Sequence, residues 1–209
     1  NFAGLSRIKC EENKINCINT NFKSIKKIIN FLNKFNDKPH FIFISTSHVY
    51  NFSRTKLKEK SKTNPKNIYS KLKLRSENYI KRYYKNYTIL RLFNIYGPNQ
   101  SKNYFIQDMR EKIKKGSVIK IDKSIRDFIH VSEVSRVIKF IIKKKINGTI
   151  NVGSGKGYSL IKIVKYLSKK LKKKPILIVK NEKTKLVADI SLLKSYGFKT
   201  TINEKYINF

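Results

Sequence analysis

Apolar runs and amphipathic segments alternate along this chain, which predicts a protein of alternating strands and helices. Phe41–Ser45 is an apolar run that ends in hydroxyl side chains, a pattern typical of a buried parallel strand. Before it, Phe22–Phe35 carries apolar residues at helical spacing and predicts an amphipathic helix that covers a sheet. After it, Lys66–Tyr84 predicts a second helix and Thr88–Phe93 a second buried strand.

The predicted units become shorter beyond the turn at Gly97-Pro98. We expect helices at Tyr104–Lys115, Ser132–Lys144 and Leu160–Leu171, and strands at Val118–Ile121, Thr149–Val152 and Pro175–Val179. The predicted fold class is therefore α/β, built around a parallel sheet. No linker or low-complexity segment separates the later units from the earlier ones, so we expect the two parts to interlace.

The charge of the chain is unusual, because 48 Lys and Arg against 13 Asp and Glu give a formal net charge of +35. A chain this basic is able to attract nucleic acid or an anionic membrane. The lysines, however, are scattered through nearly every segment, and no helix-turn-helix, zinc or RNA-recognition signature is present. We therefore interpret the charge as a solvated surface and expect no specific nucleic-acid partner.

Hydrophobic residues make up 40% of the chain, which indicates a globular protein rather than a disordered one. Apolar runs such as Phe41–Ile44 are far too short to span a membrane, so we expect no membrane association. Cys10 and Cys17 give neither a disulfide framework nor a metal-ligand set, and no metal site is predicted. We expect both to be reduced thiols in a helical region of a cytoplasmic enzyme.

Candidate chemistry lies in the predicted helix Lys66–Tyr84, where Tyr69 and Lys73 are four residues apart and share one face. An ammonium close to a phenol stabilises the phenolate and lowers the pKa of the tyrosine toward working pH. Such a tyrosine can act as a general acid or base on a sugar hydroxyl. The spacing alone favours a solvated helix face, and the order of the neighbouring segments changes that interpretation.

The order of these segments resembles the extended short-chain dehydrogenases/reductases, in particular the NAD-dependent epimerase/dehydratase family that acts on nucleotide sugars. The resemblance is carried by Ser45-Thr46, Val49-Tyr50, Tyr69 with Lys73, Leu90–Pro98, Arg126–Val131, Asn151–Gly155, Ala188-Asp189 and Gly197-Phe198. It implies that residues 1–97 form part of a Rossmann-type NAD-binding domain, and that residues 98–209 mainly form a smaller substrate-binding part. It also implies a nucleotide-sugar substrate, NAD or NADP as the cofactor, and a homodimer.

By this resemblance the catalytic residues are Tyr69, Lys73 and Thr46. Tyr69 is expected to be the base, and Lys73 is expected to assist it and to hold the nicotinamide ribose. Thr46 is expected to hydrogen-bond the reacting sugar oxygen. Hydride would move between the sugar C4 and the cofactor, while the protein supplies orientation.

Further cofactor contacts are implied for Ala3, Gly4, Asn19 and Ser45. Ala3 and Gly4 resemble the small residues after a strand that let the cofactor approach. Asn19 matches an asparagine near the cofactor and sugar, although it is equally suited to cap the helix that follows.

Substrate contacts are implied for Ser47, His48, Asn94 and Arg126. Asn94 matches a position that contacts the nucleotide diphosphate, and Arg126 offers the planar charged fork that suits a diphosphate. A simple pairing of Arg126 with Asp127 is the alternative. His130 is expected to be a structural histidine at a junction between a strand and a helix.

The sequence departs from the family pattern in two places. No G-x-x-G-x-x-G loop is present, so we expect a chain that lacks the first strands of the sheet, is part of a longer product and binds NAD poorly alone. Ser47 and His48 stand where sugar dehydratases of the family carry an Asp-Glu pair. Because elimination needs an acid and a base there, a 4,6-dehydratase is disfavoured against a 4-epimerase or 4-keto-reductase. The alternative from another class is a non-catalytic relative that acts as a basic binding module.

Overall fold

The computed structural model describes residues 3–201, and the chain divides into two compact units. The first unit consists of residues 1–51, 58–92 and 138–152, and the second of residues 52–57, 93–137 and 153–209. The chain therefore crosses between the units repeatedly instead of completing one before it begins the other. The predicted strands and helices are all present, with ends that lie within a few residues of the expected positions.

The first unit is built on a parallel sheet, which confirms the predicted α/β class. Its strands are β1 (Phe41–Thr46), β2 (Tyr87–Leu92) and β7 (Gly148–Val152), in the spatial order β1-β2-β7. Helix α4 (Ile68–Tyr83) connects β1 to β2. Parallel strands need such a crossover, and it leaves the carboxyl end of β1 beside the beginning of the helix.

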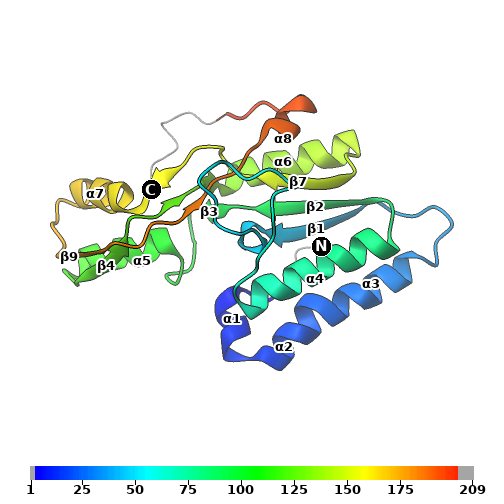
Figure 1. Ribbon diagram of the computed structural model, residues 1–209, viewed down its shortest axis with the longest axis horizontal. Helices are drawn as coiled ribbons and strands as arrows, with labels where there is room; N and C mark the ends of the chain where they lie inside the picture. Colours follow the sequence, from blue (N-terminus) through cyan, green and yellow to red (C-terminus); the bar gives the residue numbers. More distant parts are fainter. Residues whose placement is uncertain (1–2, 202–209) are drawn as a thin grey trace. The chain divides into compact units, whose positions relative to one another are not determined.

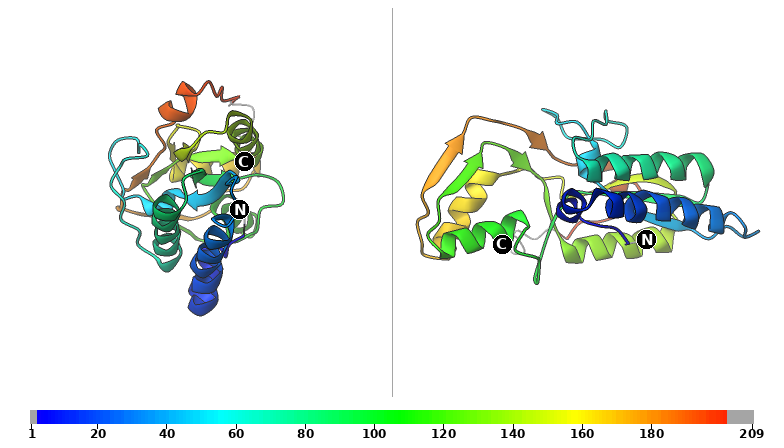
Figure 2. Two further views of the ribbon diagram at one scale, coloured as in Figure 1. Left: turned by 90° about the vertical axis from the view of Figure 1, so that its right-hand side faces the viewer. Right: turned by 90° about the horizontal axis from the view of Figure 1, so that it is seen from below.

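Two helices cover one face of this sheet. α3 (Ser24–Leu32) and α4 lie side by side there, and their apolar side chains meet those of β1 and β2 (Figure 1, Figure 2). Ile29, Phe43, Ile80 and Ile89 form the centre of this core and are at most 1% exposed. Burial of each such side chain contributes about 1.5–3 kcal/mol. This packing stabilises α3, which has nine residues and would be only marginally stable in isolation. The second half of α6 (Val131–Lys144) runs on the other side of the sheet (Figure 1).

The N-terminal segment folds into the short helices α1 (Arg7–Glu12) and α2 (Lys14–Ile18), followed by a π-helical turn at Asn19–Lys23. Asn13 ends α1 and caps α2 through its side chain, so the chain bends there and brings Cys10 and Cys17 together. The two cysteines form a disulfide with a Cα–Cα distance of 4.9 Å. The prediction of reduced thiols was therefore wrong, because number and spacing say nothing of a bend that brings two nearby cysteines into bonding range.

The second unit contains short paired strands. β3 (Asn94–Tyr96) pairs with β6 (Phe128–His130), and β4 (Ile119–Asp122) pairs with β9 (Leu177–Lys180), in both cases parallel. β5 (Ile125–Arg126) lies between β10 (Lys185–Leu186) and β8 (Tyr158–Ser159).

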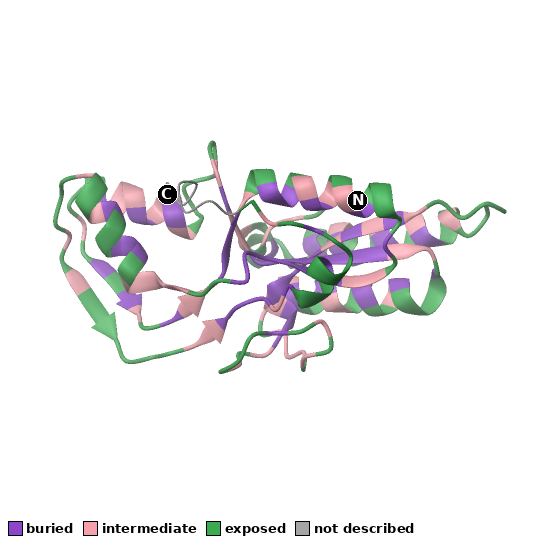
Figure 3. Cartoon of the chain, turned by 90° about the horizontal axis from the view of Figure 1, so that it is seen from above, coloured by how far each residue is buried: buried purple, intermediate pink, exposed green. Residues whose placement is uncertain are grey.

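The helices of the second unit are α5 (Phe105–Lys114), α7 (Leu160–Lys170) and α8 (Ser191–Ser195), together with the first half of α6. Its core joins α5, α7 and the strands β4 and β6 through Ile113, Leu167, Ile119 and Phe128. Figure 3 shows buried and exposed residues alternating along the longer helices, in agreement with one buried and one exposed face. Within residues 3–201, no helix combines the length and apolar character that a membrane crossing requires.

Candidate active site

The beginning of α4 places the predicted catalytic pair. Asn67 caps the helix, since its side chain accepts a hydrogen bond from Ser70 N at 2.9 Å and the Ser70 hydroxyl accepts one from Asn67 N at 3.4 Å. This reciprocal capping box fixes the first helical residue at Ile68. Tyr69 therefore lies in the first turn, and Lys73 one turn later on the same side.

Lys73 is buried between α4 and β1, with only 6% of its surface exposed. Its Nζ donates to Ile44 O at 2.8 Å, and lies 4.8 Å from the centre of the Phe43 ring and 5.9 Å from that of Tyr69. Burial lowers the pKa of Lys73 to about 8, although the charge of Glu77 acts in the opposite direction. The structure thus brings Tyr69 and Lys73 together at the end of β1, as the spacing predicts.

The hydroxyl residues at the end of β1 point to different partners. Ser45 Oγ donates to the Glu77 carboxylate at 2.5 Å. Thr46 Oγ1 accepts from His48 N at 3.2 Å, which starts a 3₁₀ turn at Ser47–Val49. Ser47 is 1% exposed, and its hydroxyl has no hydrogen-bond partner among the residues that the structure describes. His48 is half-buried beside it.

The N-terminal segment approaches Lys73 through Gly4. A Cβ atom on Gly4 would lie 3.3 Å from Lys73 Nζ and 2.8 Å from Asn21 Oδ1, so the residue must be small. Ala3, just before it, is exposed. The segment is held by Asn21, whose side chain accepts from Leu5 N at 2.9 Å and donates to Leu5 O at 3.0 Å.

Asn21 is the residue of this region that the sequence interpretation missed. It is 1% exposed, whereas Asn19, which was assigned from the resemblance, is exposed on the same π-helical turn. A signal was present in the sequence, because Asn21 directly precedes the predicted helix Phe22–Phe35 and stands four residues before Ile25 of its apolar face. A polar residue on a buried face usually has a bonding role.

Asn94 and Arg126 belong to the second unit. Asn94 Nδ2 donates to Asp127 O at 2.9 Å, across the pairing of β3 with β6. The Arg126 guanidinium donates to Thr184 O at 3.0 Å and to Thr184 Oγ1 at 2.7 Å, and it lies over the Phe52 ring at 5.3 Å. Burial lowers the pKa of Arg126.

The alternative pairing of Arg126 with Asp127 does not form. The Asp127 carboxylate accepts hydrogen bonds from Ser154 N, Ser154 Oγ, Gly155 N and Ala188 N at 2.7–3.1 Å. The glycine-rich turn at residues 153–155 therefore binds a carboxylate of its own chain. His130 ends β6 just before α6, with Nδ1 2.7 Å from Ser132 Oγ, in agreement with a structural histidine at that junction.

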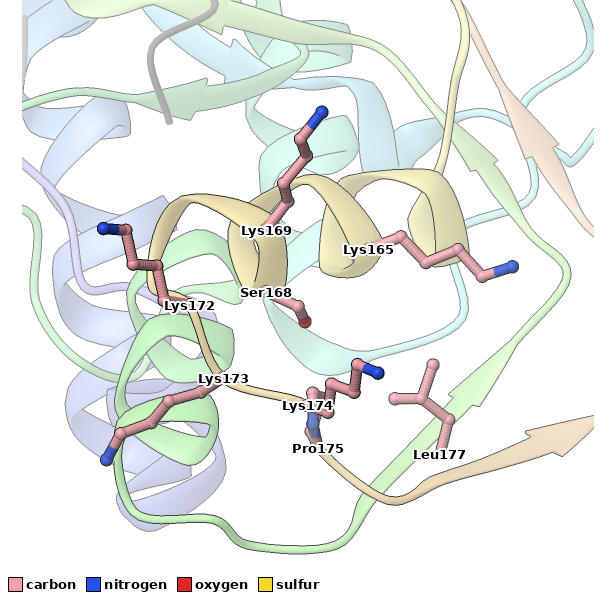
Figure 4. Close-up of a pocket in the computed structure, with 8 residues that line it drawn as sticks. All are labelled: Lys165, Ser168, Lys169, Lys172, Lys173, Lys174, Pro175 and Leu177. Carbon is pink, nitrogen blue, oxygen red and sulfur yellow. The ribbon is translucent and has the colours of Figure 1, made fainter.

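A surface cavity of about 610 Å³ lies in the second unit, where α7 ends. Its lining consists mostly of lysines: Lys165, Ser168, Lys169, Lys172, Lys173, Lys174, Pro175 and Leu177. Figure 4 shows the amines of Lys165, Lys169 and Lys172 pointing away from one another. Lys173 Nζ is bonded to Lys114 O at 2.5 Å. The lysine stems line the cavity, but their charges do not converge on one anion.

Comparison with known families gives a match to the model "NAD dependent epimerase/dehydratase family" over residues 1–153. A curated relative, the GDP-6-deoxy-D-talose 4-dehydrogenase of Aggregatibacter actinomycetemcomitans, is 35% identical over 130 residues, which cover 59% of this chain and 44% of that protein. An uncharacterized UDP-glucose epimerase of Bacillus subtilis is 28% identical over 133 residues, 59% of this chain and 42% of the relative. The chain thus spans less than half the length of these curated relatives.

Solved structures resemble the fold over nearly the whole chain. The UDP-N-acetylglucosamine 4-epimerase of Methanobrevibacter ruminantium, in complex with UDP-N-acetylmuramic acid, has a TM-score of 0.85 and 27% identity, covering 98% of this chain and 71% of that one. The UDP-glucuronic acid 4-epimerase of Bacillus cereus, in complex with UDP-glucuronic acid and NAD, has a TM-score of 0.84 and 23% identity, covering 97% and 69%. The second likeness concerns the fold alone.

Proposed function

The chain belongs to the NAD dependent epimerase/dehydratase family, and from this premise we propose that it carries the acid–base residues of a nucleotide-sugar 4-epimerase or 4-keto-reductase. One observation carries the proposal: Lys73 is buried beside the Tyr69 ring and bonded to β1 two residues before Thr46. A buried ammonium with a lowered pKa is a costly arrangement that the fold alone does not require, and such groups cluster at functional sites.

In the proposed reaction, Tyr69 and Thr46 bind the hydroxyl on the sugar C4. The Lys73 ammonium stabilises the Tyr69 phenolate, and the phenolate accepts the hydroxyl proton as hydride leaves C4. Thr46 holds the same oxygen through its own hydroxyl, so the reacting group is oriented by two residues from different elements. In the reverse direction Tyr69 returns the proton to the C4 oxygen.

The residues around Lys73 fit a nicotinamide cofactor. The ammonium has three N–H donors, and Ile44 O accepts one of them, so donors remain for a ribose hydroxyl. Gly4 carries no side chain that would crowd this ammonium. NAD, when bound, supplies the hydride acceptor and donor.

The substrate contacts proposed for the second unit rest on Asn94 and Arg126. Arg126 is positively charged and has no carboxylate in ion-pair contact among residues 3–201, which suits a diphosphate. Near the reacting sugar, the buried Ser47 hydroxyl still needs a partner, and a sugar hydroxyl would provide one. No carboxylate stands at Ser47 or His48, so dehydration across C5 and C6 stays disfavoured.

The test is turnover of a panel of UDP- and GDP-sugars with NAD and with its reduced form. A 4-epimerase converts the sugar without net use of the cofactor, whereas a 4-keto-reductase consumes one reduced cofactor for each product. We expect Tyr69→Phe to lose turnover by about 10²-fold or more, because the phenolic proton is removed.

Tyr83→Phe is the matched control, since Tyr83 lies on the same helix and is 46% exposed. It should keep full turnover. If Tyr69→Phe turned over as fast as the unmodified chain, the assignment of Tyr69 would be wrong. The turnover tests use a version of the chain that also carries a G-x-x-G-x-x-G segment, because we expect the chain alone to bind NAD poorly. If that version bound polyanions tightly and showed no turnover, a non-catalytic basic module would replace the enzyme as the leading function.

A further inference from the structure

A buried ion pair joins α4 to the sheet one turn beyond Lys73. Glu77 is fully buried, and Arg91 on β2 is 2% exposed. Arg91 Nη2 lies 2.6 Å from Glu77 Oε2, and Arg91 Nε donates to both carboxylate oxygens at 3.1 and 3.2 Å. Ser45 Oγ on β1 donates to the same carboxylate at 2.5 Å. One side chain of α4 is thus bonded to both neighbouring strands.

The Arg91 guanidinium has further contacts besides those with Glu77. Its Nη1 donates to Glu59 O at 2.9 Å, and its guanidinium lies 4.6 Å from the centre of the Tyr50 ring. The Tyr50 hydroxyl in turn donates to Asn151 Oδ1 on β7 at 2.7 Å. Burial alone would lower the pKa of Arg91, but the hydrogen bonds and charge of Glu77 raise it. Arg91 therefore stays charged, and this cluster of side chains is held at one geometry.

Glu77 continues the stripe of α4 that carries the catalytic pair. Tyr69, Lys73 and Glu77 are four residues apart, so they lie one above the other on the side that faces the sheet. Lys73 is bonded to Ile44, and Glu77 to the next residue of β1. The residue after that is Thr46. The two bonds fix the height of α4 against the end of β1.

We propose that Glu77 is a positioning residue: bonded to Arg91 and Ser45, it holds α4 at the height where Tyr69 and Lys73 act together with Thr46, with its carboxylate one helical turn beyond Lys73. What these three residues do chemically rests on the proposed function. The positioning itself rests on the contacts of Glu77.

The groups around Lys73 identify Glu77 as the relevant charge. Tyr69 and Glu77 face Lys73 from its own helix, the Phe43 ring and the Ile44 carbonyl face it from β1, and Gly4 with Asn21 faces it from the N-terminal segment. Only Tyr69 and Glu77 of these can titrate. Glu77 raises the pKa of Lys73 against the larger effect of burial, so removal of its charge should lower that pKa below about 8.

The experiment is an NMR titration of the whole chain labelled with ¹³C at lysine Cε, with the Lys73 signal assigned from a Lys73→Arg variant. We expect the pKa of Lys73 to fall by at least about half a unit in Glu77→Gln, which keeps the shape of the side chain and removes its charge. Glu133→Gln is the matched control, because Glu133 is 8% exposed and paired with Arg136 at 2.6 Å in the second unit. It should leave the Lys73 titration unchanged.

Turnover provides the second readout. If Glu77 positions the pair, Glu77→Gln should lower kcat about tenfold or more with little change in KM, and the alkaline limb of the pH profile should move to lower pH with Lys73. A role in stability alone would leave kcat of the folded variant close to that of the unmodified chain. The titration needs no substrate, so it decides the proposal even if no nucleotide sugar is turned over.

Glu77→Gln leaves Arg91 without its partner and is able to unfold the chain. A double variant, Glu77→Leu with Arg91→Leu, removes both charges, and such replacements of buried ion pairs are often neutral for stability. Because Glu77, and not Arg91, is among the causes that act on the pKa of Lys73, that pKa should fall in this variant too. An unchanged Lys73 titration in either folded variant overturns the proposal. Failure of both variants to fold overturns it too, because the Glu77–Arg91 pair would then have a role in stability only.

Discussion

Lys73 makes the stability of the first unit depend on pH, because its pKa is lowered on folding. Its pKa is about 8 in the folded chain and 10.5 as the ordinary value for lysine. A group whose pKa is depressed on folding adds stability above its unfolded pKa, and that stability is lost as pH falls through the folded pKa. The unfolding free energy should therefore rise between about pH 8 and pH 10.5.

The magnitude follows from the two pKa values. The difference between the two pKa values corresponds to about 3 kcal/mol, at about 1.4 kcal/mol for each pKa unit. Over the narrower range from about pH 7.5 to pH 9.5 the linkage relation gives a rise of about 2 kcal/mol. Burial raises the pKa of Tyr50 and of Tyr96 to about 12, so both oppose the trend above about pH 10 and set the upper limit of the useful range.

The assay is urea unfolding at a series of pH values, for the unmodified chain and for Lys73→Met. Methionine keeps the length of the side chain and does not titrate. We expect the unmodified chain to gain about 2 kcal/mol relative to the variant between about pH 7.5 and pH 9.5. Parallel curves for the two proteins would refute the reasoning, since they would show that Lys73 has the same pKa in the folded and the unfolded chain.

Three further predictions concern stability and use thermal or urea unfolding as the measurement. Asp127→Ala should lose at least about 3 kcal/mol, because four buried donors lose their acceptor, and a smaller loss would mean that water replaces the carboxylate. Gly153→Ala should lose more than about 1 kcal/mol, because the new Cβ would lie 2.7 Å from Asp127 Oδ2 and 2.8 Å from Ala188 Cβ, and a neutral effect would show that the turn can move. Cys10→Ser should lose about 2–3 kcal/mol of unfolding free energy under oxidising conditions, because the Cys10–Cys17 bond that it removes closes a short loop. Under reducing conditions the variant should match the unmodified chain, since neither protein then has the bond.

The sequence predicted the parts of the molecule that depend on local pattern. The apolar run of β1 predicted a buried strand, and the spacing in α4 predicted that Tyr69 and Lys73 share one face of a helix, because strand burial and helical periodicity are local properties. Their role was predicted from the order of the segments around them. The pairing of Glu77 with Arg91 could not be predicted in the same way. The two residues are 14 positions apart on different elements, and only the register of α4 on β2 brings them together.

The sequence pattern also could not predict which residues of a turn are buried. Asn19 and Asn21 are both asparagines at the beginning of one predicted helix, and a π-helical turn decides which of them is buried. Cys10 and Cys17 meet because Asn13 ends one short helix and caps the next. A resemblance places residues approximately along a chain, whereas a shift of two positions on a helix moves a side chain by about 200° and changes what it contacts.

The large net charge and the chemistry of the site are separate properties of this molecule. Among residues 3–201, Lys73 and Arg91 are the buried basic residues. Lys73 lies on α4, and Arg91 lies on the neighbouring strand β2. The other basic side chains that the structure describes lie at least partly in solvent, where salt largely screens the repulsion between charges that are more than about 10 Å apart. Glu77 contacts Arg91 directly and acts on Lys73 through its charge, so one carboxylate acts on both buried cations. The buried charges on α4 and β2 are therefore distinct from the solvated lysines that give the chain its large net charge.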